Sequence, residues 1–525
     1  GMFRPLLAPF AVLVALGLLS GLFEVVGVGV LIPLFAQAVS HAGPGSDVFS
    51  QLIGTLFDWL HLSFSVRHLL MFIVGLFLLK AVALLLFSYT RVRLTATYEA
   101  RTRGEIYRAM MDTSWGYLIR QKVGYVENVL MTDIGMVVSL LKQCSSFVLV
   151  FTSLLLYTIA AFSISSFITM LALAIGSVSL ILYRPLILRT RQLARHQTKL
   201  NKRVAHFINE YVAGLKVIKT MAVGARIADI AQSLFDKLKQ NRIRFFFLRE
   251  ASGLLMMPLG VIFICFIFAA SYLRPDFRLE IFIASVYLVN RLFDYFDKVQ
   301  GSLHTLFEAM PFAEHVWNLQ SEIRSSRETD HGTRAFRFEQ SMVFSHVSFS
   351  YPSTAGAIRD VSLTIPQGSF IGIIGPSGAG KTTLVDLLLR LNDPLEGAIF
   401  VDDIPLNEIA LPDWRRAVGY VPQEIFLINA TVEENIKFHR PLTDADMMAA
   451  ARAAQIHDII EQLPHGYQTN VGERGMHLSM GQRQRIALAR VLAGKPSVLI
   501  LDEATSSLDV ESERLIQQAL MNLRG

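Results

Sequence analysis

The sequence predicts a membrane domain built only of helices, followed by an α/β domain that contains a phosphate-binding loop. Three observations lead to this class. Six apolar stretches lie in the first 296 residues, a glycine-rich motif occupies Gly375–Thr382, and the composition is unusually apolar. Hydrophobic residues make up 52% of the chain and charged residues 18%, whereas soluble domains carry roughly 25% charged residues. This composition excludes a disordered chain, and the two cysteines exclude a disulfide scaffold.

The six apolar stretches are predicted to span a membrane. A spanning helix needs about 20 mostly apolar residues, and each stretch reaches that length once its flanks are counted. The predicted spans are Leu6–Ala36, Leu69–Tyr89, Phe147–Ser163, Phe167–Leu188, Leu254–Tyr272 and Ile281–Phe296.

Loop charges predict the orientation of these spans. Thr90–Ser145 holds eight Lys/Arg and Ile187–Ser252 holds fourteen, whereas Gln37–Ser65 holds none. Positive loops stay in the cytoplasm, so we expect both basic loops and both chain ends there. We interpret the basic residues as topology signals; the alternative is recognition of lipid or nucleic acid, and no nucleic-acid partner is expected. Helical periodicity in Ala194–Ile218 and Ala228–Phe246 predicts helices that continue below the membrane.

The composition changes after Trp317, which predicts a domain boundary. We expect a transmembrane domain over residues 2–320, a polar linker over 321–341 and a second domain over 342–525. Short β-like segments begin the second domain, as expected of an α/β fold.

The phosphate-binding loop has the full pattern G-x-x-x-x-G-K-[ST] at Gly375–Thr382. We expect a strand at Phe370–Ile374 before it and a helix at Thr383–Leu391 after it. Backbone N–H groups would then surround the phosphates, Lys381 would supply a positive charge, and the Thr382 hydroxyl would reach Mg²⁺. The predicted phosphate site consists of Gly375, Ser377, Gly378, Gly380, Lys381, Thr382 and Thr383.

A second apolar strand, Ser497–Leu501, ends in two carboxylates. This arrangement is typical of the Walker B element of a P-loop nucleoside triphosphatase. Asp502 is predicted to hold the metal, and Glu503 to polarise the attacking water as the catalytic residue.

Together with further motifs, these elements resemble an ATP-binding cassette exporter half-transporter, a similarity that covers nearly the whole chain. Tyr351 in Phe349-Ser-Tyr-Pro matches the aromatic residue that stacks on adenine in this family. Gln423 in Tyr-Val-Pro-Gln matches the Q-loop, which implies contact with Mg²⁺. Val471–Gly475 resembles the X-loop of exporters.

The family's signature motif is matched by Leu478-Ser-Met-Gly-Gln482, and its D-loop by Ser506-Ser-Leu-Asp509. The resemblance implies that Ser479, Gly481, Gln482 and Asp509 contact the ATP of a partner subunit. One such domain and six spans make half a transporter. We therefore expect a homodimer, with a heterodimer as the alternative.

The sequence departs from the family pattern at two places. Met480 stands where the signature motif usually has glycine, and no histidine here matches the switch histidine expected some thirty residues beyond Glu503. We therefore expect the nucleotide-binding domain to be incomplete at its C-terminus, and the ATPase activity of this chain to depend on that. A weakly hydrolytic, ATP-gated channel or regulatory subunit is the rival interpretation.

Three charged residues in the predicted spans are substrate candidates. Glu24, Lys80 and Arg291 lie in apolar surroundings, where charge is costly and usually functional. A structural Glu24–Lys80 pair between helices is the alternative for the first two. Arg291 would either contact an anionic substrate group or serve as a topology charge.

The segment after the first span predicts an amphipathic helix, Asp47–Leu60, on the outer membrane surface. Packing of this helix against the spans is the alternative. With Glu24–Pro33 it resembles flippases of lipid-linked oligosaccharides and related glycolipid exporters. The expected apolar face consists of Phe49, Leu52, Leu56, Trp59 and Leu60.

These resemblances imply a type IV ABC exporter-like fold and an ATP-driven exporter or flippase that uses ATP and Mg²⁺. We expect it in the inner (plasma) membrane, with its nucleotide-binding domain in the cytoplasm and a lipid-linked glycan or other amphipathic substrate. Multidrug, lipid or peptide export is the alternative.

Overall fold

The structure is a computed structural model that divides into two compact units. The first comprises residues 1–111 and 122–325, and the second comprises 112–121 and 326–525. The structure describes residues 7–521 apart from 32, 35–36, 38–47, 60, 62, 122–124, 183, 255, 273–278, 352–357, 503–512, 515–516 and 519–520.

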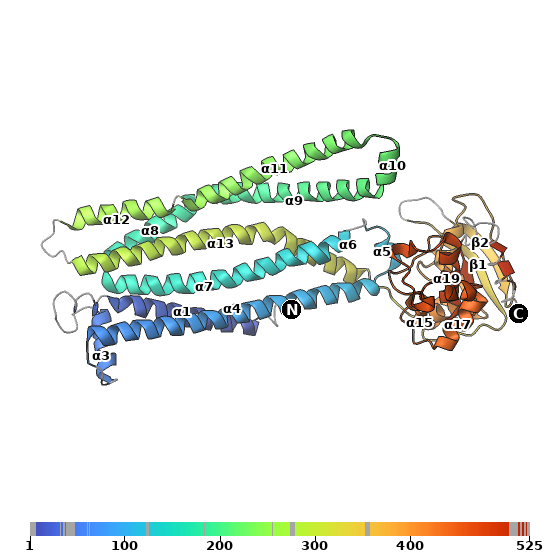
Figure 1. Cartoon of the computed structure of the whole chain (residues 1–525), viewed down its shortest axis with the longest axis horizontal. Helices are drawn as coiled ribbons and strands as arrows, with labels where there is room; N and C mark the ends of the chain where they lie inside the picture. Colours follow the sequence, from blue (N-terminus) through green and yellow to red (C-terminus); the bar gives the residue numbers. More distant parts are fainter. Residues whose placement is uncertain are drawn as a thin grey trace. The chain divides into compact units, whose positions relative to one another are not determined.

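The first unit is helical, and a bundle of long helices forms its centre (Figure 1). In the described residues the bundle consists of α1 (Leu7–Gly29), α4 (Val66–Met111), α7 (Ile134–Ile164) and α13 (Leu279–Ser325). Leu13, Phe87 and Leu141, from three of these helices, are buried together. A short helix α6 (Tyr125–Asn128) and a π-helical turn (Val129–Asp133) lead into α7.

Five further helices described in this unit form a second group beside the bundle. Its members are α8 (Ser166–Leu182), α9 (Arg184–Ala213), α10 (Leu215–Thr220), α11 (Gly224–Leu254) and α12 (Met256–Ser271). α9 and α11 run antiparallel and α10 joins them at one end (Figure 1). The helices predicted over 194–218 and 228–246 are therefore present, although the first one breaks at Gly214.

Helix lengths agree with a membrane protein. Within the described residues, apolar windows long enough to cross a bilayer lie in the helical stretches 7–29, 66–111, 125–164 and 166–213. The fifth predicted span contains a shorter apolar helix, Pro258–Ala270, and the sixth is the first part of α13. α4 and α13 have 46 and 47 residues, so each continues well past its predicted span.

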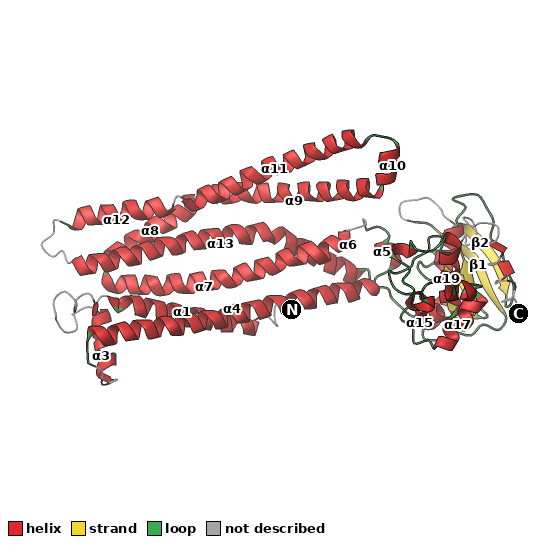
Figure 2. Cartoon of the chain, in the orientation of Figure 1, coloured by secondary structure: helices red, strands yellow, loops and turns green. Residues whose placement is uncertain are grey.

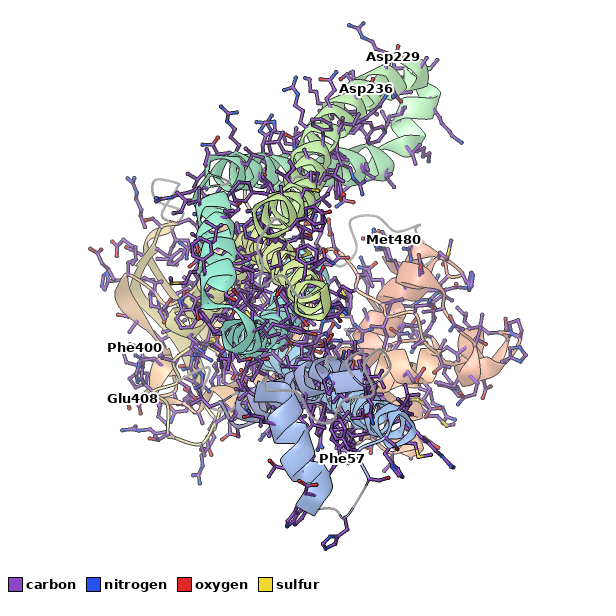
Figure 3. All side chains as sticks on the ribbon, turned by 90° about the vertical axis from the view of Figure 1, so that its left-hand side faces the viewer. Phe57, Asp229, Asp236, Phe400, Glu408 and Met480 are labelled. Carbon is purple, nitrogen blue, oxygen red and sulfur yellow. The ribbon has the colours of Figure 1, made fainter. Side chains whose placement is uncertain are left out.

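The predicted external helix is present as α3 (Val48–Trp59), but its packed face differs from the expected one. Ile53 and Phe57 are buried against Val30 and Leu69, so this helix packs on the bundle (Figure 3). Trp59 is 76% exposed. Apolar residues near the end of α1 and the start of α4 pack against one face of α3. Ile53 and Phe57, which are four residues apart, lie on that face.

In its described residues, the second unit contains two sheets (Figure 2). Its antiparallel sheet has the strand order β2-β1-β3-β4, built of β1 (Ser341–Phe349), β2 (Ile358–Pro366), β3 (Glu396–Val401) and β4 (Ile404–Pro405). In the parallel sheet, β5 (Val418–Val421) pairs with β6 (Val498–Leu501). The helices are α5 (Trp115–Leu118), α14 (Lys381–Leu388), α15 (Leu411–Ala417), α16 (Val432–Lys437), α17 (Asp444–Ala453), α18 (His457–Glu461) and α19 (Met480–Leu492).

Two apolar cores hold this unit together. α14 packs on the antiparallel sheet, where Phe344 and Leu387 are buried. The buried Trp414 joins the same core, and its Nε1–H donates to the carbonyl of Leu388 at 2.8 Å. The other core lies among α16, α17 and α19, with Ile436 and Ile486 fully buried. These cores fix α14 and α19, the two helices that begin at the predicted ATP-contacting motifs.

The strand predicted at Phe370–Ile374 does not form. This segment belongs to neither described sheet, and Ile374 is 95% exposed. A parallel strand is stable only where neighbours pair its backbone and cover its faces. β5 and β6 pair directly with each other, so neither places this segment between them.

The segment after α13 is held by a carboxylate. α13 ends at Ser325, inside the predicted linker. Further on, Asp330 accepts hydrogen bonds from the N–H groups of Leu411 and Gly332, both at 3.0 Å, and pairs with Arg390 at 3.4 Å. Burial alone raises the pKa of Asp330, but the two N–H donors and the guanidinium bring it below its ordinary value.

This arrangement predicts how acid weakens the second unit. The pKa of such a carboxyl is about 4 in the unfolded chain and lower in the folded protein. Its carboxylate therefore stabilises the fold at pH values above about 4, and this stabilisation is lost as the pH falls through the folded-state pKa. We expect Asp330→Asn to lower stability at pH 7 by about 1 kcal/mol, after allowance for partial exposure, and to flatten the acid dependence. Thermal melts from pH 7 to pH 3 would test this. Asp393→Asn, an equal charge change without these bonds, should leave the acid dependence unchanged.

Candidate nucleotide site and transmembrane charge cluster

The phosphate-binding loop has the backbone that its glycines allow. Gly378 and Gly380 lie in the left-handed region, with φ of +81° and +89°. Residues that carry a Cβ atom rarely adopt this backbone conformation, so glycine is needed at both positions. Gly380 caps α14, whose first residue is Lys381. The Lys381 ammonium donates to the carbonyls of Gly375 at 2.8 Å and Pro376 at 3.1 Å. The loop and the helix N-terminus thus form a positively charged cradle, an arrangement that suits phosphate.

Within this cradle the three other predicted residues differ in accessibility. Ser377 and Thr382 are exposed, whereas Thr383 is buried under the first turn of α14. The Thr382 side chain is therefore open to a ligand, and Thr383 contributes chiefly its backbone.

Tyr351 contacts α14 in this structure. Its hydroxyl donates to Asp386 at 3.1 Å, and its ring meets Phe349 edge-on, with centroids 5.0 Å apart. Burial raises the pKa of Asp386, and the nearby Asp502 carboxylate adds to the shift. Stacking of Tyr351 on adenine remains a prediction that rests on the family pattern.

Asp502 lies at the carboxyl end of β6. Its N–H donates to the carbonyl of Val421 at 3.0 Å, and its carboxylate accepts from the Tyr420 hydroxyl at 3.4 Å. Burial raises the pKa of Tyr420 to about 12, with further contributions from Asp502 and Asp386. Tyr420 therefore stays protonated near neutral pH, as a donor to Asp502.

The carboxyl ends of β5 and β6 bring two predicted metal ligands to one edge. Gln423 is exposed and lies two residues after the end of β5. Asp502 comes directly after β6, the strand that pairs with β5 in parallel. A carboxylate and an amide oxygen are donors that suit Mg²⁺. The predicted catalytic Glu503 and the D-loop Asp509 lie outside the described residues.

Sequence reasoning did not single out Tyr420 and Asp386, which contact Asp502 and Tyr351. Asp386 lies four residues from Thr382 on α14, so helical spacing was the available signal. No signal in the sequence could have identified Tyr420, because only the register between β5 and β6 places it beside Asp502.

The signature motif forms the start of α19. Ser479 caps the helix: its Oγ accepts from the N–H of Gln482 at 3.2 Å, and the Gln482 side chain accepts from the N–H of Ser479 at 2.9 Å. Gly481 is buried, whereas the Met480 side chain is exposed (Figure 3). Ser479 and Gln482 thus define the helix start. Contact of these residues with a partner's ATP remains a prediction.

All three substrate candidates meet in the helical unit. Glu24 of α1 is only 6% exposed, and it pairs with Lys80 of α4 at 3.1 Å. Arg291 of α13 lies 3.8 Å from the same carboxylate, and the Tyr295 hydroxyl donates to it at 3.4 Å. The Glu24–Lys80 pair, given above as the alternative to a substrate role, is therefore present. The cluster joins three helices through one buried carboxylate.

Further polar residues of α13 extend this cluster. Arg291 donates from Nε to the Tyr287 hydroxyl at 2.9 Å and lies 3.7 Å from Asp294, which also pairs with Lys298 at 2.7 Å. Sequence reasoning missed these members. Their spacing of three and four residues, in and just after a predicted span, would have indicated a polar helix face.

Comparisons with known proteins agree with this arrangement. The family model of the ABC transporter transmembrane region matches residues 11–293, and that of the ABC transporter matches residues 358–506. An ATP-dependent lipid A-core flippase of Acinetobacter baylyi is 45% identical over 37% of this chain and 34% of its own length. A protein of the same description from Chromohalobacter salexigens is 28% identical over 86% of this chain and 78% of its own length.

A solved structure gives the same fold. The structure of a bacterial Atm1-family ABC exporter with ATP bound aligns with a TM-score of 0.77 at 21% identity, covering all of this chain and 90% of that one. The predicted exporter fold, a helical transmembrane region followed by an α/β domain, is confirmed. With the transmembrane family model matching more than half of the sequence, the chain belongs to the ABC transporter family.

Proposed function

We propose that this chain is one half of an ATP-driven exporter or flippase that moves an amphipathic, lipid-like substrate outward by alternating access. One observation carries the proposal. A helical unit with a buried ion cluster at Glu24 is joined, in one chain, to a unit in which Lys381 begins a helix at a phosphate-binding loop. Buried membrane charge marks a transport path, and the loop marks a source of energy.

The nucleotide site would use residues from three parts of the second unit. Lys381 and the N–H groups of the loop would hold the ATP phosphates, and Thr382, Gln423 and Asp502 would hold Mg²⁺. The bound metal neutralises phosphate charge. Glu503 would orient the attacking water, and Tyr420 would keep the Asp502 carboxylate in place through its hydrogen bond.

The second half of the transporter would be another copy of this chain. Ser479, Gly481, Gln482 and Asp509 would complete the ATP site of the partner, so that two ATP lie at equivalent sites. We place the protein in the inner membrane with the nucleotide-binding unit in the cytoplasm, because the basic loops are expected on that side.

A lipid-linked glycan is the proposed substrate. Both flippases reported above are named for lipid A-core. Glu24 faces two cations, Lys80 and Arg291, and Arg291 also lies near Asp294. These two cations would be the contacts for an anionic group of the lipid headgroup.

ATP hydrolysis in liposomes tests this function. We expect turnover by the full chain to rise severalfold when a pyrophosphate-linked lipid glycan is added, and the rise to be absent in Glu503→Gln. Arg291→Gln should raise the glycan concentration needed for half-maximal stimulation, because it removes a cation but leaves the nucleotide site intact. Turnover indifferent to any amphiphile would contradict the proposal.

A further inference from the structure

One carboxylate of the second unit, Asp386, lies outside the motifs of the nucleotide site but contacts its predicted members. It is half-buried on α14, five residues after Lys381. Its Oδ2 accepts a hydrogen bond from the Tyr351 hydroxyl at 3.1 Å. Burial raises the pKa of Asp386, and the Asp502 carboxylate is close enough to raise it further. Asp386 therefore borders both the predicted adenine-stacking ring and a predicted metal ligand.

Two side chains of α14 hold the Tyr351 hydroxyl. Besides Asp386, the Thr383 side chain forms a hydrogen bond with it, which offsets part of the rise that burial causes in the pKa of Tyr351. Thr383 is only 6% exposed. Residues three apart lie on the same face of a helix, so Thr383 and Asp386 reach the hydroxyl together. With the buried Phe349 packed against it, the Tyr351 ring is held at its hydroxyl and along its side.

A stacking ring that is held in advance gains affinity for a base. Ordering a side chain during binding lowers affinity by its conformational cost, and hydrogen bonds that exist before binding remove that cost. α14 begins at Lys381, which is bonded to a carbonyl of the phosphate-binding loop. Lys381 and Asp386 are five residues apart, or about 7.5 Å along the helix axis. One helix thus sets the spacing between the cation for the phosphates and the ring for the base.

The apolar core of this unit does not explain Asp386. α14 packs on the antiparallel sheet through Leu384, Leu387 and Leu388, which are all buried, and Asp386 is not part of that core. A half-buried carboxyl near a second carboxylate is an unfavourable arrangement for either charge. The bond from Tyr351 favours the charged form of Asp386 and offsets part of that penalty. Carboxyl groups in such surroundings are concentrated at functional sites.

We propose that Asp386 is a positioning residue for the nucleotide base: with Thr383 it holds the Tyr351 hydroxyl, so that the ring is presented to adenine in one orientation. The proposal rests on the proposed function, in which this site binds ATP, and on the predicted stacking of Tyr351 on adenine. It assigns to Asp386 an effect on affinity for the base, and none on the chemistry at the phosphates.

A ligand without a base tests this role. Binding of Mg²⁺-ATP and of Mg²⁺-tripolyphosphate to the full chain in nanodiscs is measured by competition with a fluorescent ATP analogue, whose own Kd is determined for each variant. A Glu503→Gln background prevents hydrolysis. We expect Tyr351→Phe and Asp386→Leu each to weaken ATP binding about fivefold, the size of effect expected from ordering one side chain. Both should bind tripolyphosphate within twofold of the unchanged chain.

Further variants show whether the hydrogen bond is responsible. Asp386→Asn keeps an oxygen that accepts from the hydroxyl, and should bind ATP within twofold of the unchanged chain. The double variant Tyr351→Phe/Asp386→Leu should bind no more weakly than the weaker single variant, because both remove the same bond. Tyr467→Phe, the matched control, removes a hydroxyl bonded to His457 at 2.8 Å and should leave ATP binding unchanged. With Glu503 restored, the KM for ATP should rise about fivefold in Tyr351→Phe while kcat stays within twofold.

Three results would overturn the proposal. Equal losses of ATP and tripolyphosphate binding would show that Asp386 supports the phosphate-binding loop or the fold. Additive losses in the double variant would show that Tyr351 and Asp386 act separately. A fall in kcat without a rise in KM would assign Asp386 to the metal site beside Asp502. Because Tyr351→Phe removes the same bond with a smaller change, it decides the outcome if Asp386→Leu folds poorly.

Failure of this proposal can be told apart from failure of the proposed function. If Tyr351→Ala binds ATP as the unchanged chain does, the ring does not stack on adenine, and the positioning role is rejected while the exporter remains. If the base-dependent losses appear but no amphiphile stimulates turnover, the positioning role stands and the proposed export is rejected.

Discussion

Lys381→Ala is expected to lower the rate of ATP hydrolysis at least a hundredfold. The Lys381 ammonium is held by two loop carbonyls, from Gly375 and Pro376, at the start of α14. In the predicted site it would turn from these carbonyls to the β- and γ-phosphates and stabilise the charge that develops on them during hydrolysis. Loss of one contact to a developing charge typically costs two to three orders of magnitude in rate. Phosphate release by the full chain in nanodiscs is the measurement.

Two further variants make this result specific. Lys495→Ala removes an exposed lysine of the same unit, which pairs with Asp446, and should leave turnover within twofold. Glu503→Gln should abolish turnover but retain a fluorescent ATP analogue, whereas Lys381→Ala should weaken binding of that analogue as well. If Lys381→Ala kept more than a third of the turnover, the loop would not be the hydrolytic site.

Local chemistry made much of the nucleotide site predictable. The glycine pattern, Lys381 at a helix start and Asp502 at a strand end each follow from short-range requirements, and the structure has all three. The expected strand at Phe370–Ile374 failed because pairing depends on residues far away in the sequence. An apolar run alone does not show whether a neighbouring strand will be available.

In the helical unit, too, local features could be predicted from the sequence and contacts between distant residues could not. The high cost of charge in a membrane marked Glu24 and Lys80 as substrate candidates, with a structural pair as the alternative, and the two side chains do pair. Arg291, more than two hundred residues further along the chain, was a candidate on its own, and only the packing of α13 brought it to the same carboxylate. For α3 the helix was predictable, but the packed face was set by its neighbours.

Glu24→Gln is expected to destabilise the helical unit by about 2–3 kcal/mol. A fully buried charge that loses its partner usually costs about 3–5 kcal/mol, but the side chains of Lys80 and Arg291 are 19% and 34% exposed. The substitution would leave the Lys80 ammonium and the Arg291 guanidinium without the carboxylate they share. Lys80→Met should lower the stability of the helical unit by less, because Arg291 and the Tyr295 hydroxyl still contact Glu24. Melting midpoints of the full chain in detergent micelles are the measurement. As a control, Glu99→Gln breaks the half-buried pair with Arg103 and should cost under about 1 kcal/mol.

A double variant decides between the two interpretations of this cluster. If Glu24 and Lys80 chiefly stabilise the bundle, then Glu24→Leu/Lys80→Leu should recover much of the stability lost in Glu24→Gln, because no buried charge of the pair is left unmatched. The effects of the single variants would then be strongly non-additive, since the two residues are in contact. If instead Glu24→Gln melts like the unchanged chain while glycan-stimulated turnover falls, the carboxylate acts on the substrate. The structural alternative for this pair would then be wrong.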